Sequence, residues 1–298
     1  MMILTLDDMI FARMRDSADL APLLARFDNR PAVFYQHAPE RSNGAWGVSQ
    51  YPRVDFVVDI RDEPLHNSAG TLEISVWSAT KSEYSPEQIE RVIRELLHAT
   101  FAKPIDGSLY CIAWARSGAF DGTMDDEKEG AVIGCMMQFS VKALPVQKIF
   151  SPDPITAISA WLKAKRPGYT VIGADDIAGW LVPSSEAPVV YWNLTDVVVE
   201  RETNCCVWYR CALVGHVLAP TATQRFSISC TVLDDLAMES RVLMSDGSPM
   251  MISDGTASAE ADSLDDGQLT MTVRFGVLRS VRQPYSATKV QNLTFDAP

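Results

Sequence analysis

The chain has 298 residues and a mass of 32.9 kDa, which predicts two domains of roughly 100–200 residues each. Apolar residues make up 47% of it and charged residues 21%, and these values exclude the disordered and collagen-like classes. The formal net charge is -12, because 38 acidic side chains outnumber 26 basic ones. This balance disfavours a protein that wraps nucleic acid, since binding to phosphates needs cationic side chains.

Signals for export, membrane insertion and disulfide bonding are weak. The first residues, MMILTLDD, lack the Lys or Arg that precedes the apolar part of a secretory signal. No run of about 20 apolar residues occurs, so we expect no membrane-spanning segment. The cysteines include no CxxC pair and mostly alternate with apolar residues, which favours buried free thiols over the alternative of disulfides. They are Cys111, Cys135, Cys205, Cys206, Cys211 and Cys230.

The first half begins with helical signals. Thr5 is a candidate N-cap, and Asp7 and Asp8 suit the positive end of a helix dipole. The polar residues 16–19 interrupt the apolar stripe before it resumes at Leu20, which predicts two short helices or one kinked helix. A short strand at 31–35 and a polar loop at 37–50 follow.

Strict alternation then predicts strands at 53–61 and 71–76, each with one covered face. Ser85, Pro86 and Gln88 open an amphipathic helix whose apolar stripe extends to Phe101. Two further strands, near 108–118 and 131–142, close the unit, with an acidic loop at 119–130 between them.

The second half repeats this order after a junction marked by Pro145, Pro152 and Pro154. We expect a helix at 155–162, strands near 188–200 and 205–217, a helix at 220–238, and strands near 249–260 and 268–279. The fold class predicted is therefore α+β, with two similar domains that each pack helices on one face of a mostly antiparallel sheet. The predicted domains are 1–148 and 149–281, followed by a C-terminal tail at 282–298.

Motifs that carry chemistry are missing from the sequence. It contains no HExxH, GxSxG, Walker A or GxGxxG pattern, and its four histidines, His37, His66, His98 and His216, are dispersed. We interpret His98 and His216 as packing residues. The acidic stretch 121–129 lacks the ligand spacing of a calcium loop, and Cys205-Cys206 suits an ordinary strand, on which neighbours point to opposite faces. We expect no catalytic residue, no metal and no cofactor.

Three stretches of the first half follow one another in a recognisable order: LDDMIFARMRDSADLAPLLARF, PAVFYQHAP, and RVDFVVDIRDEPLHNSAGTLEISVWSATKSEYSPEQIERVIRELLHATF. In this order and spacing, about residues 1–145 resemble the tail-completion, or tail-terminator, proteins of tailed bacteriophages. Matching features are the acidic residues before Pro64, the alternating strand that ends at Trp77 and the capped amphipathic helix after it. The second half matches in architecture, as a degenerate second copy.

The resemblance implies a structural virion protein, assembled in the host cytoplasm, that forms a homo-oligomeric ring, a hexamer in this family. Such a ring caps the tail tube, stops its growth and offers the neck proteins a docking surface. DNA passes through the ring without specific binding, which suits acidic side chains along a lumen. The alternatives are another neck or tube component, or an enzyme on an α+β scaffold; the enzyme is less favoured because no set of titratable groups stands out.

Three long segments, 37–50, 119–130 and 282–298, are the candidate contacts with other subunits, the tube and the neck. Loops beyond about 12 residues are usually functional or disordered, and exposed aromatic residues often anchor interfaces. The alternative is that the aromatic residues fold back on their own domain. The candidate interface residues are Trp46, Asp125, Asp126, Glu127, Tyr285 and Phe295.

Overall fold

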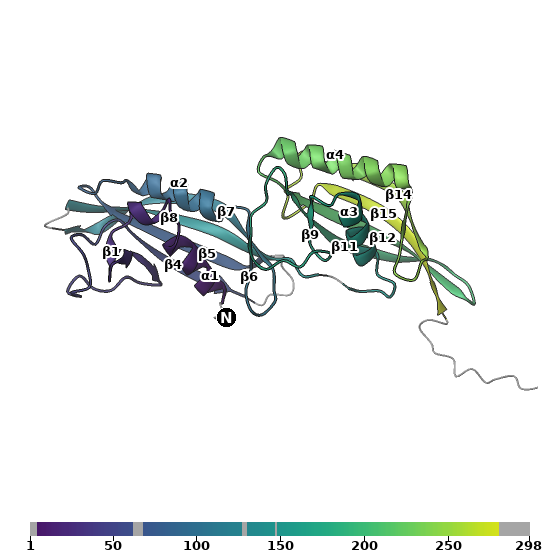
Figure 1. The fold of residues 1–298 in the computed structure, drawn as a ribbon, viewed down its shortest axis with the longest axis horizontal. Coiled ribbons are helices and arrows are strands. Elements are labelled where there is room, and N and C mark those ends of the chain that lie inside the picture. Colours follow the sequence, from purple (N-terminus) through teal and green to yellow (C-terminus); the bar gives the residue numbers. More distant parts are fainter. Residues whose placement is uncertain (1–4, 62–67, 127–129, 147, 280–298) are drawn as a thin grey trace, which may run out of the picture. The chain divides into compact units, whose positions relative to one another are not determined.

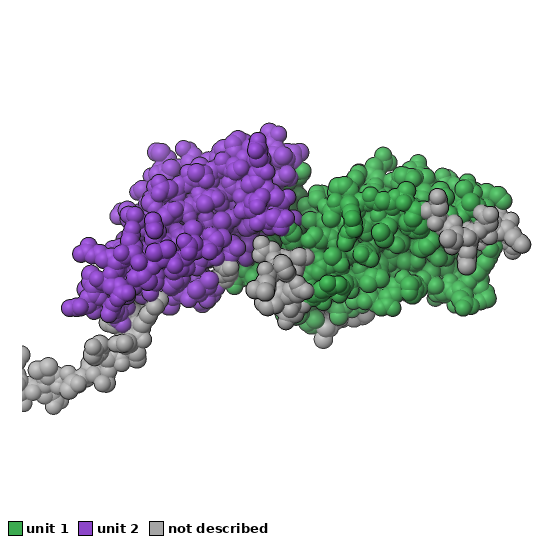
Figure 2. Space-filling view, turned by 180° about the vertical axis from the view of Figure 1, so that it is seen from behind, with its two compact units in different colours: residues 1–146, 175–189, 218–220 green, residues 147–174, 190–217, 221–298 purple. Residues whose placement is uncertain are grey.

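The computed structural model describes residues 5–61, 68–126, 130–146 and 148–279, with the backbone alone for residues 68 and 121–126. The chain forms two compact units, coloured separately in Figure 2. Unit 1 comprises Met1–Val146, Asp175–Val189 and Leu218–Pro220, and unit 2 comprises Gln147–Ala174, Val190–Val217 and Thr221–Pro298. The chain first passes from unit 1 to unit 2 after Val146, close to the predicted boundary at 148. One boundary there does not separate the two units, because residues 175–189 belong to unit 1.

Unit 1 is built on a seven-stranded sheet with the strand order β10-β6-β7-β8-β5-β4-β3. Figure 1 labels β4, β5, β6, β7 and β8 of this sheet. Strand β3 pairs with β4 in parallel, and the other neighbours pair antiparallel. A separate two-stranded ribbon pairs β1 with β2. The elements are α1 (Leu6–Arg15), η1 (Ala21–Leu23), β1 (Arg26–Phe27), β2 (Arg30–Pro31), β3 (Val33–Tyr35), β4 (Arg53–Ile60), β5 (Ser68–Ala79), α2 (Pro86–Leu97), β6 (Thr100–Lys103), β7 (Tyr110–Asp126), β8 (Gly130–Ala143) and β10 (Gly179–Leu181).

Unit 2 is built on a six-stranded sheet with the order β13-β14-β15-β12-β11-β9. Its elements are α3 (Pro154–Lys165), β9 (Thr170–Val171), β11 (Val189–Glu202), β12 (Cys206–Leu218), α4 (Ala222–Glu239), β13 (Arg241–Leu243), β14 (Pro249–Ala257) and β15 (Leu269–Leu278).

The two sheets have the same topology. If β3, β4, β5, β6, β7 and β8 are matched with β9, β11, β12, β13, β14 and β15, the strand orders coincide, and α1 and α2 match α3 and α4 in chain position. Strand β10 is an addition at the β6 edge of the first sheet. The prediction of an α+β protein with two similar domains is therefore confirmed.

Each unit has its own core on the helix-covered face of its sheet. In unit 1, Ile10 and Met14 of α1 and Ile89 and Ile93 of α2 are fully buried with the inward residues of β4, β5 and β8. In unit 2, α3 and α4 pack on the inward residues of β12 and β15, around Trp192. The alternation seen in the sequence therefore separates a helix-covered face from an opposite face that no helix of the described chain covers.

Local signals set the helix starts as expected. Thr5 and Asp8 form a capping box at α1, and the Ser85 N–H donates to Gln88 Oε1 at 3.0 Å at the start of α2. Helix α2 ends at Leu97, earlier than predicted, because Ala99 adopts a positive φ of 56° and the chain turns into β6. Thr100 and Phe101, the last residues of the predicted helical stripe, are buried as predicted but belong to strand β6.

The predicted loop at 119–130 is wrong. Strand β7 continues to Asp126, which pairs with Gly130 of β8, so residues 119–126 belong to one strand of a long hairpin. A register shift between Asp121 and Asp125 interrupts the regular pairing there. The sequence therefore lacks the strict apolar–polar alternation that would have predicted a strand.

Candidate interaction site

Trp46 is held in an aromatic cluster of unit 1. Its ring centroid lies 5.0 Å from that of Phe27 and 5.5 Å from that of Phe34, and residues 27 and 46 form an isolated β-bridge. The indole Nε1 donates to the Glu40 carbonyl at 3.2 Å. The half-buried indole thus folds back on its own unit and fixes the 37–50 loop. Contact with another subunit stays a prediction.

Of the other predicted interface residues, Asp125 and Asp126 lie within the described part of the chain. Asp125 and Asp126 are opposite Ala131 and Gly130 at the end of the β7–β8 hairpin. Glu127, Tyr285 and Phe295 fall outside the described residues. Of the described members of this set, Trp46 belongs to the 37–50 segment, and Asp125 and Asp126 belong to the end of the β7–β8 hairpin.

The two histidines considered for chemistry have structural contacts. His98 Nδ1 accepts a hydrogen bond from the Trp114 N–H at 3.0 Å, which links the end of α2 to β7. His216 is buried, with Nδ1 3.1 Å from the Ser263 carbonyl and its ring 5.6 Å from that of Tyr191. Burial raises the pKa of Tyr191 to about 12. Within the described ranges no group of three or more His, Cys, Asp or Glu side chains could hold a metal ion.

A polar cluster that sequence reasoning missed lies on the uncovered face of the first sheet. Arg53 is directly opposite Trp77, and Asp55 is two residues along the same strand, with its Oδ2 3.8 Å from Arg53 Nε. Asp55 Oδ1, Arg53 Nε and Trp77 Nε1 are buried and have no hydrogen-bond partner among the described residues. Burial raises the pKa of Asp55 to about 6, although electrostatic interactions with Arg53, His37 and the Trp77 side chain oppose the rise. The sequence showed the alternation of this strand but not the degree of burial.

One depression of about 450 Å³ opens on unit 1, between the segment after α1 and the turn before α2. Leu23, Val48, Tyr51, Pro52 and Tyr84 line much of it, and Lys81 and Glu83 supply charge. Its lining is therefore mixed, with apolar side chains beside charged and hydroxyl groups.

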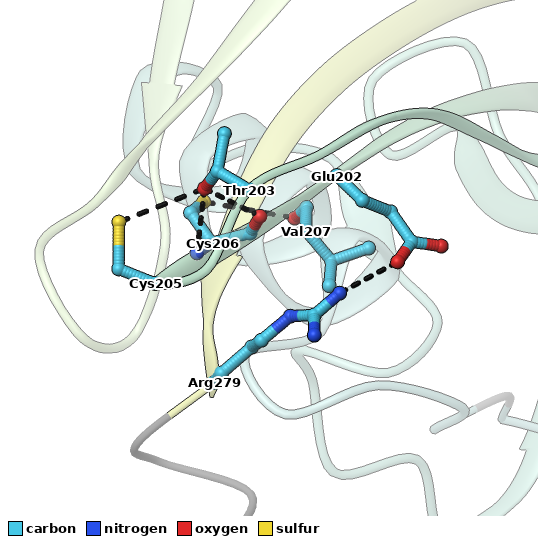
Figure 3. A network of polar contacts seen from close by, with 6 residues as sticks. All are labelled: Glu202, Thr203, Cys205, Cys206, Val207 and Arg279. Atoms are coloured by element: carbon cyan, nitrogen blue, oxygen red, sulfur yellow. Dashed lines mark hydrogen bonds and ion pairs between the residues drawn. The ribbon is translucent and has the colours of Figure 1, made fainter.

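Figure 3 shows the end of the β11–β12 hairpin in unit 2. Thr203 Oγ1 donates to the Cys206 carbonyl at 2.9 Å and accepts from its N–H at 3.0 Å, while Arg279 Nη2 meets Glu202 Oε2 at 2.6 Å. Cys205 lies in the turn, exposed, and only Cys206 belongs to the strand, which differs from the expected strand alternation. All six cysteines are free, and three of them are buried.

Comparisons with known proteins do not extend this description: no family model, no curated protein and no solved structure matches the chain. Among the described residues, no helix combines the length and apolar character needed to cross a membrane.

Proposed function

We propose that this protein is a structural component of a phage virion, a tail terminator or tail-completion protein. In this role its copies form a closed ring, in the family a hexamer, that caps the tail tube at its head-proximal end and joins it to the neck. The residues act by shape and contact rather than by catalysis. The proposal rests on the resemblance of residues 1–145 to that family, and the duplicated topology is compatible with it.

Within the described residues, the structural observation that supports the proposal is the length of sheet edge that no other strand pairs with. Strand β3 pairs with only residues 54–56 of β4, and the exposed fractions of Val57 and Ile60 beyond that pairing are 38% and 42%. Strand β6 pairs with only residues 110–112 of the 17-residue β7. An exposed strand edge presents unpaired backbone N–H and C=O groups to another chain, so stable monomers usually blunt their edges. These edges favour a protein that functions in an assembly.

A ring and a tube end fit together by a simple physical logic. A growing tube exposes an unsatisfied subunit interface, and a terminator matches that interface on one side while presenting a different surface on the other. A closed ring of identical copies requires a head-to-tail interface, in which two different surfaces of each copy meet. The net charge of -12 would let DNA pass such a ring without being retained.

Imaging of the purified protein tests the proposal. Light scattering after size exclusion gives the number of copies, and negative-stain microscopy shows whether they form a ring as wide as a tail. Added to polymerising tail-tube protein, the ring should sit at one end and shorten the tubes. A neck or tube component would instead leave tube length unchanged or extend along the tube, and a chain that stays monomeric at high concentration would contradict the proposal.

A further inference from the structure

A row of arginines crosses the sheet of unit 2 at one level. Arg241 of β13 is the register partner of Met251 of β14, Met251 is the partner of Arg274 of β15, and Arg274 is the partner of Arg210 of β12. Neighbouring strands are about 4.8 Å apart, so the row spans four strands in roughly 15 Å. We call these four residues the arginine row.

The arginine row lies on the sheet face opposite the helices. Its sequence neighbours Val242, Met250, Val273, Tyr209 and Cys211 are buried in the core, and side chains alternate between the two faces of a strand. All four residues of the row are exposed, Met251 to 43%. The row is thus a surface feature of unit 2 and does not contribute to its core.

Apolar side chains continue this surface. Trp208 lies opposite Gly276 and Cys206 lies opposite Leu278, on the same face as Arg210 and Arg274. The exposed fractions of Trp208 and Leu278 are 41% and 52%. Trp, Met and Arg are enriched at the centres of protein interfaces, where they supply large contact areas and planar hydrogen-bonding groups.

The positive charges on this face are only partly balanced. Arg274 Nη2 is 2.9 Å from Glu200 Oε1, and Asp254 is opposite Thr272 on the same face. Arg210 and Arg241 form no ion pair with a described residue. Arg210 and Arg274 are directly opposite each other, an arrangement of like charges that destabilises a sheet unless an anionic group lies between or above them.

The other unit of the chain has a net charge of the opposite sign to the arginine row. The residues of unit 1 include 24 acidic and 14 basic side chains, whereas those of unit 2 include 14 and 12. Most of the net charge of -12 therefore belongs to unit 1. Attraction between a basic patch and an acidic unit speeds association and selects its orientation.

We propose that the arginine row, together with Trp208 and Leu278, is the surface on which unit 2 of one copy binds the acidic unit 1 of a second copy. The contact joins two different surfaces, so it is head-to-tail and can propagate around a ring. This contact would supply the interface of the proposed ring. It rests on the proposed function only for the closure of the ring, because copies can associate head-to-tail through this face whatever their role. Nucleic acid is the less favoured occupant, since the row is interrupted by an apolar side chain and unit 2 itself carries no net positive charge.

Charge reversal tests the surface. The R210E/R241E variant leaves the Arg274–Glu200 pair intact, and K148E/K165E is a control with the same change in net charge at two exposed positions of unit 2 away from the row. Analytical ultracentrifugation should show association of wild type and control that weakens as NaCl rises from about 0.05 to 0.5 M. We expect R210E/R241E to weaken association by about tenfold or more, and W208A by a similar factor. Circular dichroism and thermal unfolding confirm that each variant is folded.

Cross-linking identifies the occupant. The R210K/R241K variant keeps the positive charges and introduces primary amines, which a carbodiimide can couple to nearby carboxylates. Mixing isotope-labelled and unlabelled copies distinguishes links between copies from links within one. We expect the joined carboxylates to belong to unit 1; joined carboxylates of unit 2 would overturn the assigned partner surface.

The remaining outcomes separate this inference from the proposed function. If R210E/R241E associates like wild type, the surface is wrong even where microscopy shows rings. If the variant loses association but wild type forms open chains, the surface stands and the ring proposal fails. Two further results would also overturn the inference. In the first, R210E/R241E loses binding to a labelled single-stranded oligonucleotide while its self-association is unchanged. In the second, a chain truncated after Arg279 associates more tightly, which would identify residues 280–298 as the cover of this face.

Discussion

Phe120 of β7 covers Gly134 of β8 so closely that a Cβ atom on the glycine would lie 2.2 Å from the Phe120 Cζ. The two residues are register partners, and Trp77 is opposite Gly134 on the other flanking strand. The rings of Trp77 and Phe120 meet edge to face with centroids 4.8 Å apart. Two aromatic side chains therefore meet over a glycine on the uncovered face of the first sheet, and the missing side chain makes room for both.

The Gly134→Val substitution should destabilise unit 1. The new side chain would push Phe120 against Trp77, and overpacking of this kind costs about 1–3 kcal/mol. Gly118→Val is the matched control, because nothing lies within 4 Å of a Cβ at this position on the paired strand. Urea unfolding of both variants measures the difference in the free energy of unfolding. Equal stability of the two variants would contradict the close packing described.

The carboxyl group of Asp55 should make stability depend on pH. Burial raises its pKa from 3.8 to about 6, so between these values the unfolded chain loses the proton first. The free energy of unfolding should therefore fall as the pH rises through this window, and it should be independent of this group below and above it.

The Asp55→Asn substitution removes this dependence. Relative to wild type, the variant should gain about 2 kcal/mol of stability between about pH 4 and pH 7. Asp59→Asn is the control, since Asp59 is an exposed carboxylate on the same strand, paired with Arg61 at 2.9 Å. Denaturant titrations across this range measure the effect. If the difference in the free energy of unfolding between wild type and Asp55→Asn stays constant with pH, the pKa of Asp55 is not raised in the folded protein.

The cysteines should react in separate classes. Cys205 and Cys230 are exposed, whereas Cys111, Cys135 and Cys211 are buried, and burial raises the pKa of Cys111 to about 12 and that of Cys211 to about 11. Because the thiolate is the reactive form, a disulfide reagent should modify Cys205 and Cys230 first in the native protein. A C205S/C230S variant should lose this fast phase, while unfolded protein should react at all its remaining thiols. Rapid native modification of Cys111 would be incompatible with the described core.

The C-terminal tail should contribute to assembly and not to the fold. Deletion of residues 285–298, which lie outside the described part of the chain, should leave the melting temperature of the monomer nearly unchanged, because we expect their contacts to be with other chains. Ring or tail assembly should weaken, since Tyr285 and Phe295 are lost as potential anchors. Calorimetry and assembly assays on the same preparation measure the two effects. Normal assembly of the truncated chain would assign the tail a passive role.

Several elements could be read from local sequence because local chemistry determines them. The capping residues Thr5, Ser85 and Thr221 each begin a helix, and the alternation from Leu269 to Val277 gives a strand with one buried face. Hydrogen bonds within one turn and the two-residue period of a strand need no knowledge of distant residues. The repeated order of these elements was sufficient to predict two similar α+β units.

Other features depend on residues far apart in the chain, and only the tertiary structure decided them. Strand β10 joins β6 across about 75 residues of sequence, so no local pattern could place residues 175–189 in unit 1. Arg210, Arg241 and Arg274 fall on one row because three separate strand registers agree, and Asp55 is buried because distant segments surround it. The sequence by itself determined which residues face the core. Strand order and register, set by packing across the whole sheet, decided which outward-facing residues lie together.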